Sequence, residues 1–241
     1  MSTKEGLSRR KFLQYTGIVT GAAAFAGPAS ALAAGDGEAH AGHAARPDKP
    51  LHRGRMFFTN DLEFSTLSEA CERIFPKDEN GPGAKDLAVP YFIDNQLAGA
   101  WGYNAREYTA GPYFSGESSQ GYQTALLRRD VFKQGLAAMN DAAQKEFKKY
   151  FPKLAGEEQD KILGLCEKGG LPTEGFGSAF FFGLLREAVL AGAYSDPIYN
   201  GNNNMNGWRM KDYPGAQMAY SYMIDSDKFE QIDPVSLAGM Q

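Results

Sequence analysis

Histidine is almost missing from this sequence of 241 residues. The three histidines, His40, His43 and His52, all lie near the N-terminus. A Ser-His-Asp or Cys-His catalytic arrangement needs a histidine inside the fold, so the chain beyond residue 52 holds neither. The segment "HAGH" supplies two imidazoles but no third ligand, which is too little for a zinc site. We therefore interpret these histidines as solvated residues.

Other reactive motifs are missing as well. Two cysteines are too few for an iron–sulfur cluster, and no C-x-x-C-H haem motif, G-x-G-x-x-G turn or G-K-[ST] loop occurs. The net charge is −4 and the basic residues are not clustered, so we expect no nucleic-acid partner. Carboxylates are plentiful, which leaves acid–base chemistry open without indicating a particular pair. We expect no cofactor and no metal ion in this chain.

The first 34 residues have the features of an export signal. Paired arginines in "LSRRKFLQYTG" precede an uncharged stretch, and "ASALAA" then offers the small residues Ala31 and Ala33 for cleavage. A basic start, an apolar stretch and an A-x-A site define a secretory signal peptide, and two arginines before Phe-Leu are typical of the twin-arginine (Tat) type. We predict a Tat signal peptide over residues 1–34 and a periplasmic mature protein. The signal residues are Ser8, Arg9, Arg10, Phe12 and Leu13.

The mature chain is predicted to be acidic. The uncharged stretch of the signal is rich in alanine and glycine, which favours a cleaved signal over a membrane helix. Removing residues 1–34 leaves 21 basic and 28 acidic residues, a net charge of −7. Such a chain is repelled by anionic lipid, so we expect membrane contact only through partners. Residues 35–58 are polar and without periodicity, which predicts a flexible linker, and residues 59–241 form the folded domain.

Hydrophobic periodicity predicts an all-α fold with long ordered loops. Apolar residues recur three and four positions apart, and no alternating β pattern is longer than a few residues. We expect Ser65 or Thr66 to cap the first helix and Pro76 to end it. Residues 173–194 are apolar nearly all round, so that helix must be covered on every side. The predicted helices cover residues 62–75, the region around 89–97, about 119–148, 155–168 and 173–194.

Cys71 and Cys166 both lie on the apolar faces of predicted helices. Such thiols pack as small hydrophobic side chains, but an even cysteine count in an oxidising compartment also suits a disulfide. In the chain-entropy model, a bond closing this 95-residue loop would stabilise the fold by about 4–5 kcal/mol. Both alternatives stay open at this point.

The segment "SDPIYNGNNNMNGWRMKDYPGAQ", residues 195–217, is unusually rich in asparagine and glycine. The step from Asp196 to Pro197 ends the preceding helix, and asparagines and glycines allow a compact irregular loop. Trp208 has two interpretations. It either plugs the loop onto its own domain or serves as an anchor for a partner, a role in which tryptophan is enriched.

Two blocks of sequence, "ACERIFPKDENGPGAKDLAVPYFIDNQLAG" and "DPIYNGNNNMNGWRMKDYPGAQ", resemble the gluconate 2-dehydrogenase subunit 3 family. The similarity covers about residues 62–220, and Asn200 stands where many members have glycine. The matching positions are Pro76, Pro82, Gly83, Ala84, Phe92 and Ile93 in the first block, and Asp196, Pro197, Tyr199, Gly201, Asn202, Gly207, Trp208, Pro214 and Gly215 in the second.

The resemblance implies a non-catalytic small subunit of a membrane-bound, FAD-dependent dehydrogenase complex. In such a complex a large flavoprotein oxidises D-gluconate to 2-dehydro-D-gluconate, and a multihaem cytochrome c subunit passes the electrons to quinone. FAD and haem c thus belong to partner subunits. The small subunit binds the flavoprotein and supplies its export signal to the Tat translocase. We assign partner docking or loop support to Phe180, Phe181, Asp196, Pro197, Tyr199, Gly201, Asn202, Gly207, Trp208, Tyr213, Pro214 and Gly215.

Other functions remain compatible with the sequence alone. The chain would be a free-standing exported enzyme if a carboxylate pair were catalytic, or a ligand-binding protein if the asparagine-rich loop held a small molecule. A third alternative is an export chaperone that leaves the complex after transport.

Overall fold

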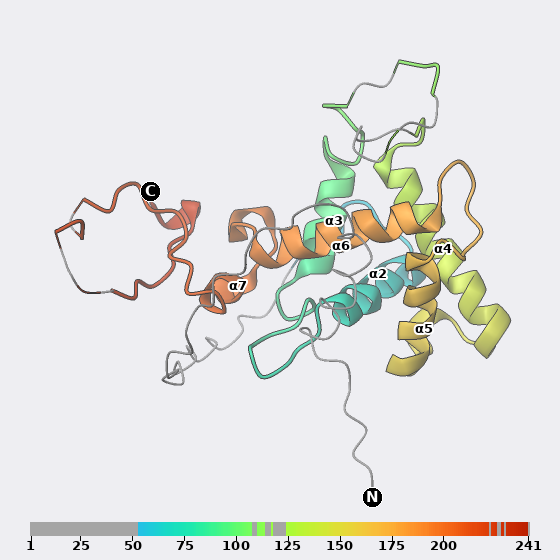
Figure 1. Cartoon of the computed structure of the whole chain (residues 1–241), viewed down its shortest axis with the longest axis horizontal. Coiled ribbons are helices and arrows are strands. Elements are labelled where there is room, and N and C mark those ends of the chain that lie inside the picture. The colour runs from blue at the N-terminus through green and yellow to red at the C-terminus, as the bar shows by residue number, and fades with distance from the viewer. Residues whose placement is uncertain are drawn as a thin grey trace, which may run out of the picture.

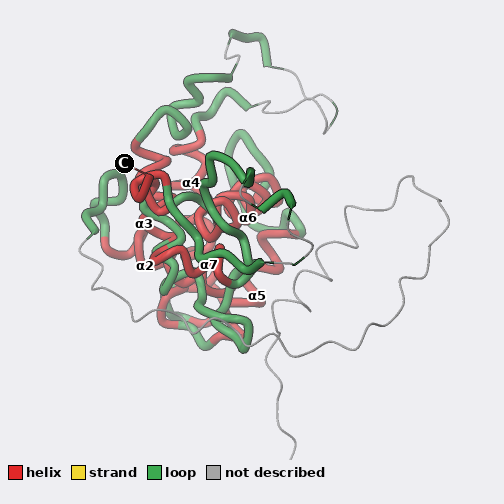
Figure 2. The backbone as a smooth tube through the Cα atoms, turned by 90° about the vertical axis from the view of Figure 1, so that its left-hand side faces the viewer, coloured by secondary structure: helices red, strands yellow, loops and turns green. Residues whose placement is uncertain are grey.

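The computed structural model describes residues 53–107, 110–113, 117, 124–221, 223–225, 228 and 230–240. Within these ranges the fold is all-α, as predicted, and no strand forms (Figures 1 and 2). The α-helices are α2 (Asp61–Ile74), α3 (Val89–Ala98), α4 (Arg128–Phe147), α5 (Gly156–Glu167), α6 (Ser178–Tyr194) and α7 (Asn206–Arg209). The 3-10 helices are η2 (Phe151–Lys153), η3 (Pro197–Tyr199), η4 (Asn203–Met205) and η5 (Leu237–Met240). The predicted signal peptide, its five signal residues and all three histidines lie outside the described residues.

Helix α6 is the centre of the fold. It packs against α2, α3, α4, α5 and α7, and in Figure 1 it crosses the helical body from side to side. Phe181 and Leu185 are fully buried on it. A Cβ atom on Gly135 of α4 would lie 2.4 Å from the Phe181 ring, so the glycine lets the two helices approach closely. The apolar surface of α6 is thus covered largely by its own domain.

Helix α2 begins earlier than predicted. The side chain of Asn60 accepts a hydrogen bond from the backbone N–H of Leu62 at 2.8 Å, which makes Asn60 the N-cap instead of Ser65 or Thr66. Thr66 lies inside the helix, where its hydroxyl donates to the Leu62 carbonyl at 2.7 Å. The predicted cap residues are therefore wrong, because the side chain of an asparagine further upstream accepts the hydrogen bond at the start of the helix.

Helices α4 and α6 both begin later than predicted. Residues 124–127, which the periodicity placed in a helix, are non-helical. The side-chain oxygen of Asn104, distant in sequence, accepts from the Arg128 backbone N–H at 3.1 Å and so stabilises the start of α4. Helix α6 begins at Ser178 instead of 173 because Gly175, at a φ of 79°, has a left-handed conformation that no helix continues.

A buried carboxylate fixes the start of the described chain. We call residues 53–60 the N-terminal arm. The Asp94 side chain of α3 is fully buried and accepts hydrogen bonds from the backbone N–H groups of Met56, Phe57 and Phe58, the last at 2.8 Å. Phe57 and Phe58 are buried in the core. The last residues of the predicted linker, 35–58, are therefore part of the folded domain.

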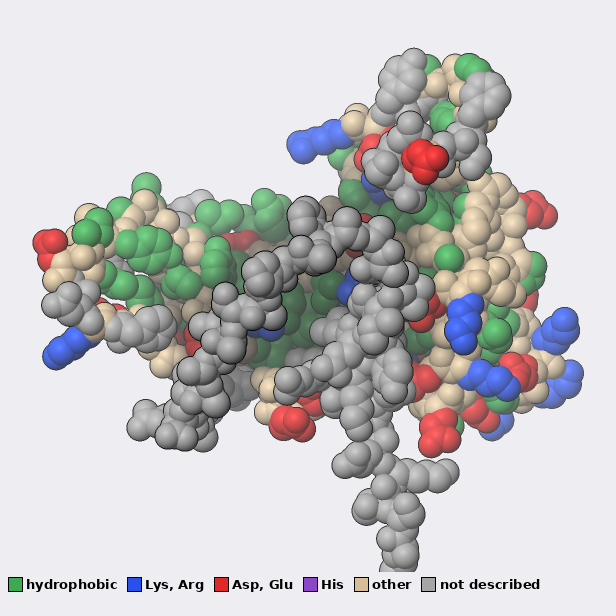
Figure 3. Space-filling view, viewed as in Figure 1, with side chains coloured by type: hydrophobic (Ala, Val, Ile, Leu, Met, Phe, Trp, Pro, Cys, Tyr) green, Lys and Arg blue, Asp and Glu red, His purple; other side chains and the backbone are tan. Residues whose placement is uncertain are grey.

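The described residues of the C-terminal segment, 213–221, 223–225, 228 and 230–240, extend away from the helical body (Figure 1) and are irregular apart from η5. The Ala216 N–H donates to the Val235 carbonyl at 2.8 Å, and Arg209 pairs with Asp233 at 2.7 Å. Hydrophobic side chains gather on this segment at the left of Figure 3. Met218 and Ile224 of this segment are 90% and 75% exposed.

Candidate functional site

Asn202 holds together residues 195–217, the asparagine-rich loop. Its Nδ2 donates to the Ser195 carbonyl at 2.8 Å, its Oδ1 accepts from the Gly207 N–H at 2.7 Å, and its backbone N–H donates to the Gly192 carbonyl at 2.9 Å. The residue is fully buried, with a φ of 45°, which asparagine tolerates better than most residues. Asn202 thus ties the two halves of the loop to each other through its side chain and ties the loop to α6 through its backbone N–H.

Two glycines allow this close contact. A Cβ atom on Gly201 would lie 2.3 Å from the Gly192 carbonyl oxygen, and one on Gly207 would lie 1.9 Å from that of Ala193. Both distances are far below van der Waals contact, so neither position accepts a side chain unless the backbone moves. Asn200, which precedes Gly201, has a φ of 70°. It keeps the left-handed conformation that a glycine would favour.

Asp196 has a structural role at the start of the loop. One carboxylate oxygen accepts from the Ile198 N–H at 3.0 Å and caps η3, whose first residue is Pro197. The other oxygen accepts from the Leu237 N–H at 2.8 Å. A single carboxylate therefore links the loop to the C-terminal segment.

Trp208 is buried against its own domain and is not an exposed anchor. Only 6% of the residue is accessible, and its indole N–H donates to the Tyr194 carbonyl at 2.7 Å. The Tyr213 ring packs edge-on against it, with centroids 5.4 Å apart. A Cβ atom on Gly215, which follows Pro214 in the turn, would lie 2.7 Å from the indole. Of the two interpretations of Trp208, the structure supports packing onto its own domain.

The remaining predicted docking residues divide by exposure. Phe181 is fully buried and Phe180 is half-buried against the core, so Phe181 has no surface to offer a partner. Tyr199 and Tyr213 are 53% and 49% exposed, and the neighbouring Ile198 is 54% exposed. The buried asparagine and glycines therefore form a rigid support from which these side chains face solvent.

Beside this loop the surface is hollowed in three adjoining places that share Gln96 of α3. The first hollow, about 290 Å³, lies between α3 and α6 against Trp101. The other two, about 470 and 460 Å³, both reach Tyr199. Sequence reasoning missed this surface, because Gln96 and Trp101 carry no motif that distinguishes them from ordinary surface residues.

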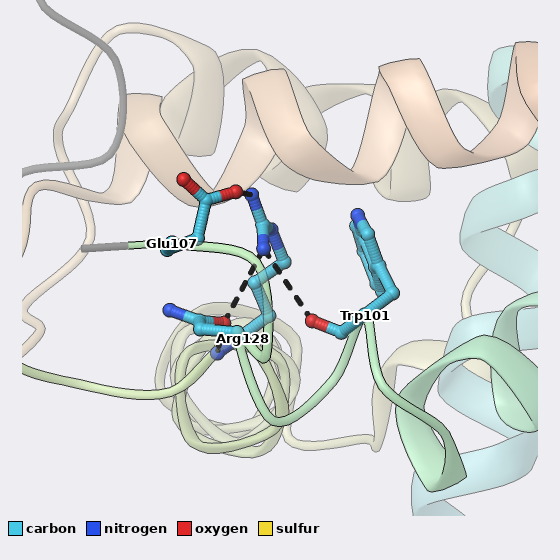
Figure 4. Close-up of polar contacts among 4 residues, drawn as sticks. Trp101, Glu107 and Arg128 are labelled. Atoms are coloured by element: carbon cyan, nitrogen blue, oxygen red, sulfur yellow. Dashed lines mark hydrogen bonds and ion pairs between the residues drawn. The ribbon is translucent and has the colours of Figure 1, made fainter. Parts of the chain in front are cut away.

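Arg128 forms the polar end of this surface, and Figure 4 shows its polar contacts. Its guanidinium pairs with Glu107 at 2.6 Å, donates to the Trp101 carbonyl and the Asn104 side chain at 3.4 Å each, and lies 5.2 Å from the centre of the Trp101 ring. Its side chain is 12% exposed. The cluster fixes the loop that follows α3 to the start of α4, so it gives this end of the surface a defined shape.

A family model described as gluconate 2-dehydrogenase subunit 3 matches residues 61–215. The chain belongs to the gluconate 2-dehydrogenase subunit 3 family. The first sequence block and Gln96 lie inside the match, as does the second block up to Gly215. No curated protein and no solved structure matches the chain. The family's name describes a subunit of a larger gluconate dehydrogenase complex.

The two thiols of this subunit 3 protein are free and buried. Burial raises the pKa of the Cys166 thiol to about 12 and raises that of Cys71 as well. The Cys166 Sγ lies 3.4 Å from the Ser178 carbonyl, to which it donates. In this structure both side chains pack in the core as protonated, weakly reactive groups.

Neither a metal-binding cluster nor a membrane-spanning helix occurs among the described residues. Within the described ranges, no three His, Cys, Asp or Glu side chains lie close enough together to hold a metal ion. No described helix combines the length and apolar character needed to cross a membrane.

Proposed function

We propose that this chain is the non-catalytic small subunit of a periplasmic, membrane-associated dehydrogenase of the gluconate 2-dehydrogenase type. The family match over residues 61–215 carries the proposal. The architecture supports it, because buried residues fix the asparagine-rich loop to the domain while Ile198, Tyr199 and Tyr213 are exposed. Such a surface suits binding, since exposed tyrosines bury a large area on a partner with little loss of side-chain entropy.

The reaction belongs to the partners in this proposal. The large flavoprotein takes a hydride from C2 of D-gluconate onto FAD while the hydroxyl proton is released, which yields 2-dehydro-D-gluconate. The electrons then pass to haem c in a cytochrome subunit and on to quinone. This chain binds the flavoprotein and contributes no group to the reacting atoms.

The Tat signal gives the subunit its second role. Tat carries folded proteins, so a signal on this chain would export a flavoprotein already loaded with FAD. Replacing both Arg9 and Arg10 with lysine should keep the chain and the flavoprotein in the cytoplasm, whereas Lys4→Arg should leave export unchanged. Export of the flavoprotein in the double variant would contradict this role.

Affinity purification of the full chain from its native host tests the docking role. We expect a flavin-containing protein and a haem c protein to co-purify at equal stoichiometry, and the complex to reduce a quinone analogue with gluconate. Recovery of the chain without a flavoprotein would refute the proposal. Gluconate oxidation by the isolated chain would instead support the free-standing enzyme.

A further inference from the structure

Three distant segments of the chain meet in one hollow. The hollow of about 470 Å³ lies between the N-terminal arm, the end of α3 and the asparagine-rich loop. Asp94 hydrogen bonds hold the arm, and Asn202 hydrogen bonds hold the loop. The walls are therefore fixed by buried polar contacts. The side chains that matter most here are Arg53, Met56, Asn95, Gln96, Ile198 and Tyr199.

Arg53 brings a positive charge into this hollow, and no described carboxylate pairs with it. Its Nη1 donates to the Asn200 carbonyl at 2.7 Å, and it forms no ion pair with any described residue. Partial burial lowers the pKa of its guanidinium. A guanidinium presents five N–H donors and binds a carboxylate through two parallel hydrogen bonds. The hollow is therefore complementary to an acidic group.

Asn95 also lines this hollow. Its Oδ1 is buried and accepts no hydrogen bond from the described part of the chain. Because that oxygen has almost no accessible surface, Asn95 shapes the wall and offers no acceptor to a partner.

The rim of the hollow is apolar and exposed. Met56 is 70% exposed, Ile198 54% and Tyr199 53%, so all three have surface to bury on a partner. The hollow also continues past Gln96 into the one lined by Trp101 and Arg106. Arg106 is exposed and forms no ion pair with any described residue. The carboxylate of Glu107 in that hollow is paired with Arg128. The surface is therefore long and partly apolar, and Arg53 and Arg106 contribute positive charges that no described carboxylate pairs.

From this combination we infer that the hollow receives an extended segment of the FAD-containing partner subunit, with an acidic side chain on Arg53. Apolar side chains of the segment cover Met56, Ile198 and Tyr199. This assignment rests on the proposed function, because it names the surface through which this subunit binds the flavoprotein. The continuous groove favours a polypeptide over a small sugar acid, which would fill one hollow alone.

Charge reversal in the assembled complex tests the assignment. Arg53→Glu should weaken co-purification or binding of the flavoprotein by about tenfold or more, because it places two acids together, and Arg53→Lys should retain most of the binding. Lys145→Glu on α4 is the matched control, since Lys145 is exposed and distant in sequence from the hollow. A photo-crosslinking residue in place of Ile198 should capture the flavoprotein, and one in place of Lys145 should not.

The outcomes separate the two proposals. If the unmodified chain co-purifies with the flavoprotein but Arg53→Glu binds normally and the Ile198 crosslinker captures nothing, the surface assignment is wrong and the proposed function stands. If the unmodified chain brings down no flavoprotein, the proposed function itself fails. Circular dichroism confirms that each variant is folded. Saturable binding of D-gluconate to the isolated chain that Arg53→Glu abolishes would overturn the peptide assignment in favour of a small-molecule site.

Discussion

Replacing Asn202 with alanine tests whether the asparagine-rich loop is a rigid support. The substitution removes two side-chain hydrogen bonds, at 2.8 and 2.7 Å, and leaves the Ser195 carbonyl and the Gly207 N–H without those partners. The buried Gly207 N–H left unpaired costs about 1–3 kcal/mol and the part-buried Ser195 carbonyl about 1 kcal/mol, and alanine at a positive φ costs about 1 kcal/mol more. We expect the free energy of unfolding to fall by about 4 kcal/mol.

Asn204 provides a matched control for this prediction. Its φ is 55°, so alanine meets the same conformational penalty there. Its Nδ2 is buried without a hydrogen-bond partner in the described structure, so alanine removes no bond. We expect Asn204→Ala to change the free energy of unfolding by about 1 kcal/mol or less. The difference between the two variants isolates the hydrogen bonds of Asn202.

Thermal and urea unfolding of the purified full chain measure both variants. For a domain of this size each kcal/mol shifts Tm by about 2–4 °C, so Asn202→Ala should lower Tm by about 8–16 °C. Equal losses in the two variants, within about 1 kcal/mol, would refute the reasoning. The loop would then owe its shape to backbone conformation and not to the Asn202 side chain.

Three further predictions concern the glycines, the thiols and the buried carboxylate. Gly207→Ala should destabilise the fold by about 3 kcal/mol or more, because its Cβ would lie 1.9 Å from a carbonyl oxygen. Gly164→Ala, whose Cβ would meet no atom within 4 Å, should instead stabilise the fold by about 0.5–1 kcal/mol. Urea unfolding compares the two variants. A thiol reagent at pH 8 should leave native Cys71 and Cys166 unmodified and titrate both in urea without reductant, and finding no thiol in urea would demonstrate a disulfide. Asp94→Asn should lower the free energy of unfolding by about 2–3 kcal/mol, because it weakens three charge-assisted hydrogen bonds. It should also speed amide hydrogen exchange at residues 56–58. Unchanged exchange would contradict the role of Asp94 in holding the N-terminal arm.

Part of the candidate site was predictable from local sequence signals. The Asp196-Pro197 step predicted the end of α6, which the structure places at Tyr194. The glycines and asparagines predicted a compact irregular loop, and Asn202 and Gly207 form its closest contacts. Whether the Trp208 side chain is buried or exposed was not predictable, because an indole suits both a core and an interface. Its hydrogen bond to the Tyr194 carbonyl depends on where α6 ends in space.

Other parts depended on contacts between distant residues. The start of α4 rests on Asn104, which is 24 residues away from the N–H it accepts, so the hydrophobic period alone placed the helix start too early. The N-terminal arm looked like linker by composition, yet Asp94 draws three of its N–H groups into the core. The hollow around Gln96 combines side chains from three segments, and none of them has a local signature of its role.

The sequence by itself determined the helical class, the family and the position of the irregular loop, since these follow from spacing and from residues whose backbone preferences are strong. The tertiary structure alone decided which side chains of the loop face solvent and which support it. It also decided that Arg53, Asn95 and Tyr199 share one hollow. The physical reason is that exposure and pairing depend on which distant groups meet, and a local pattern of residue types does not encode those meetings.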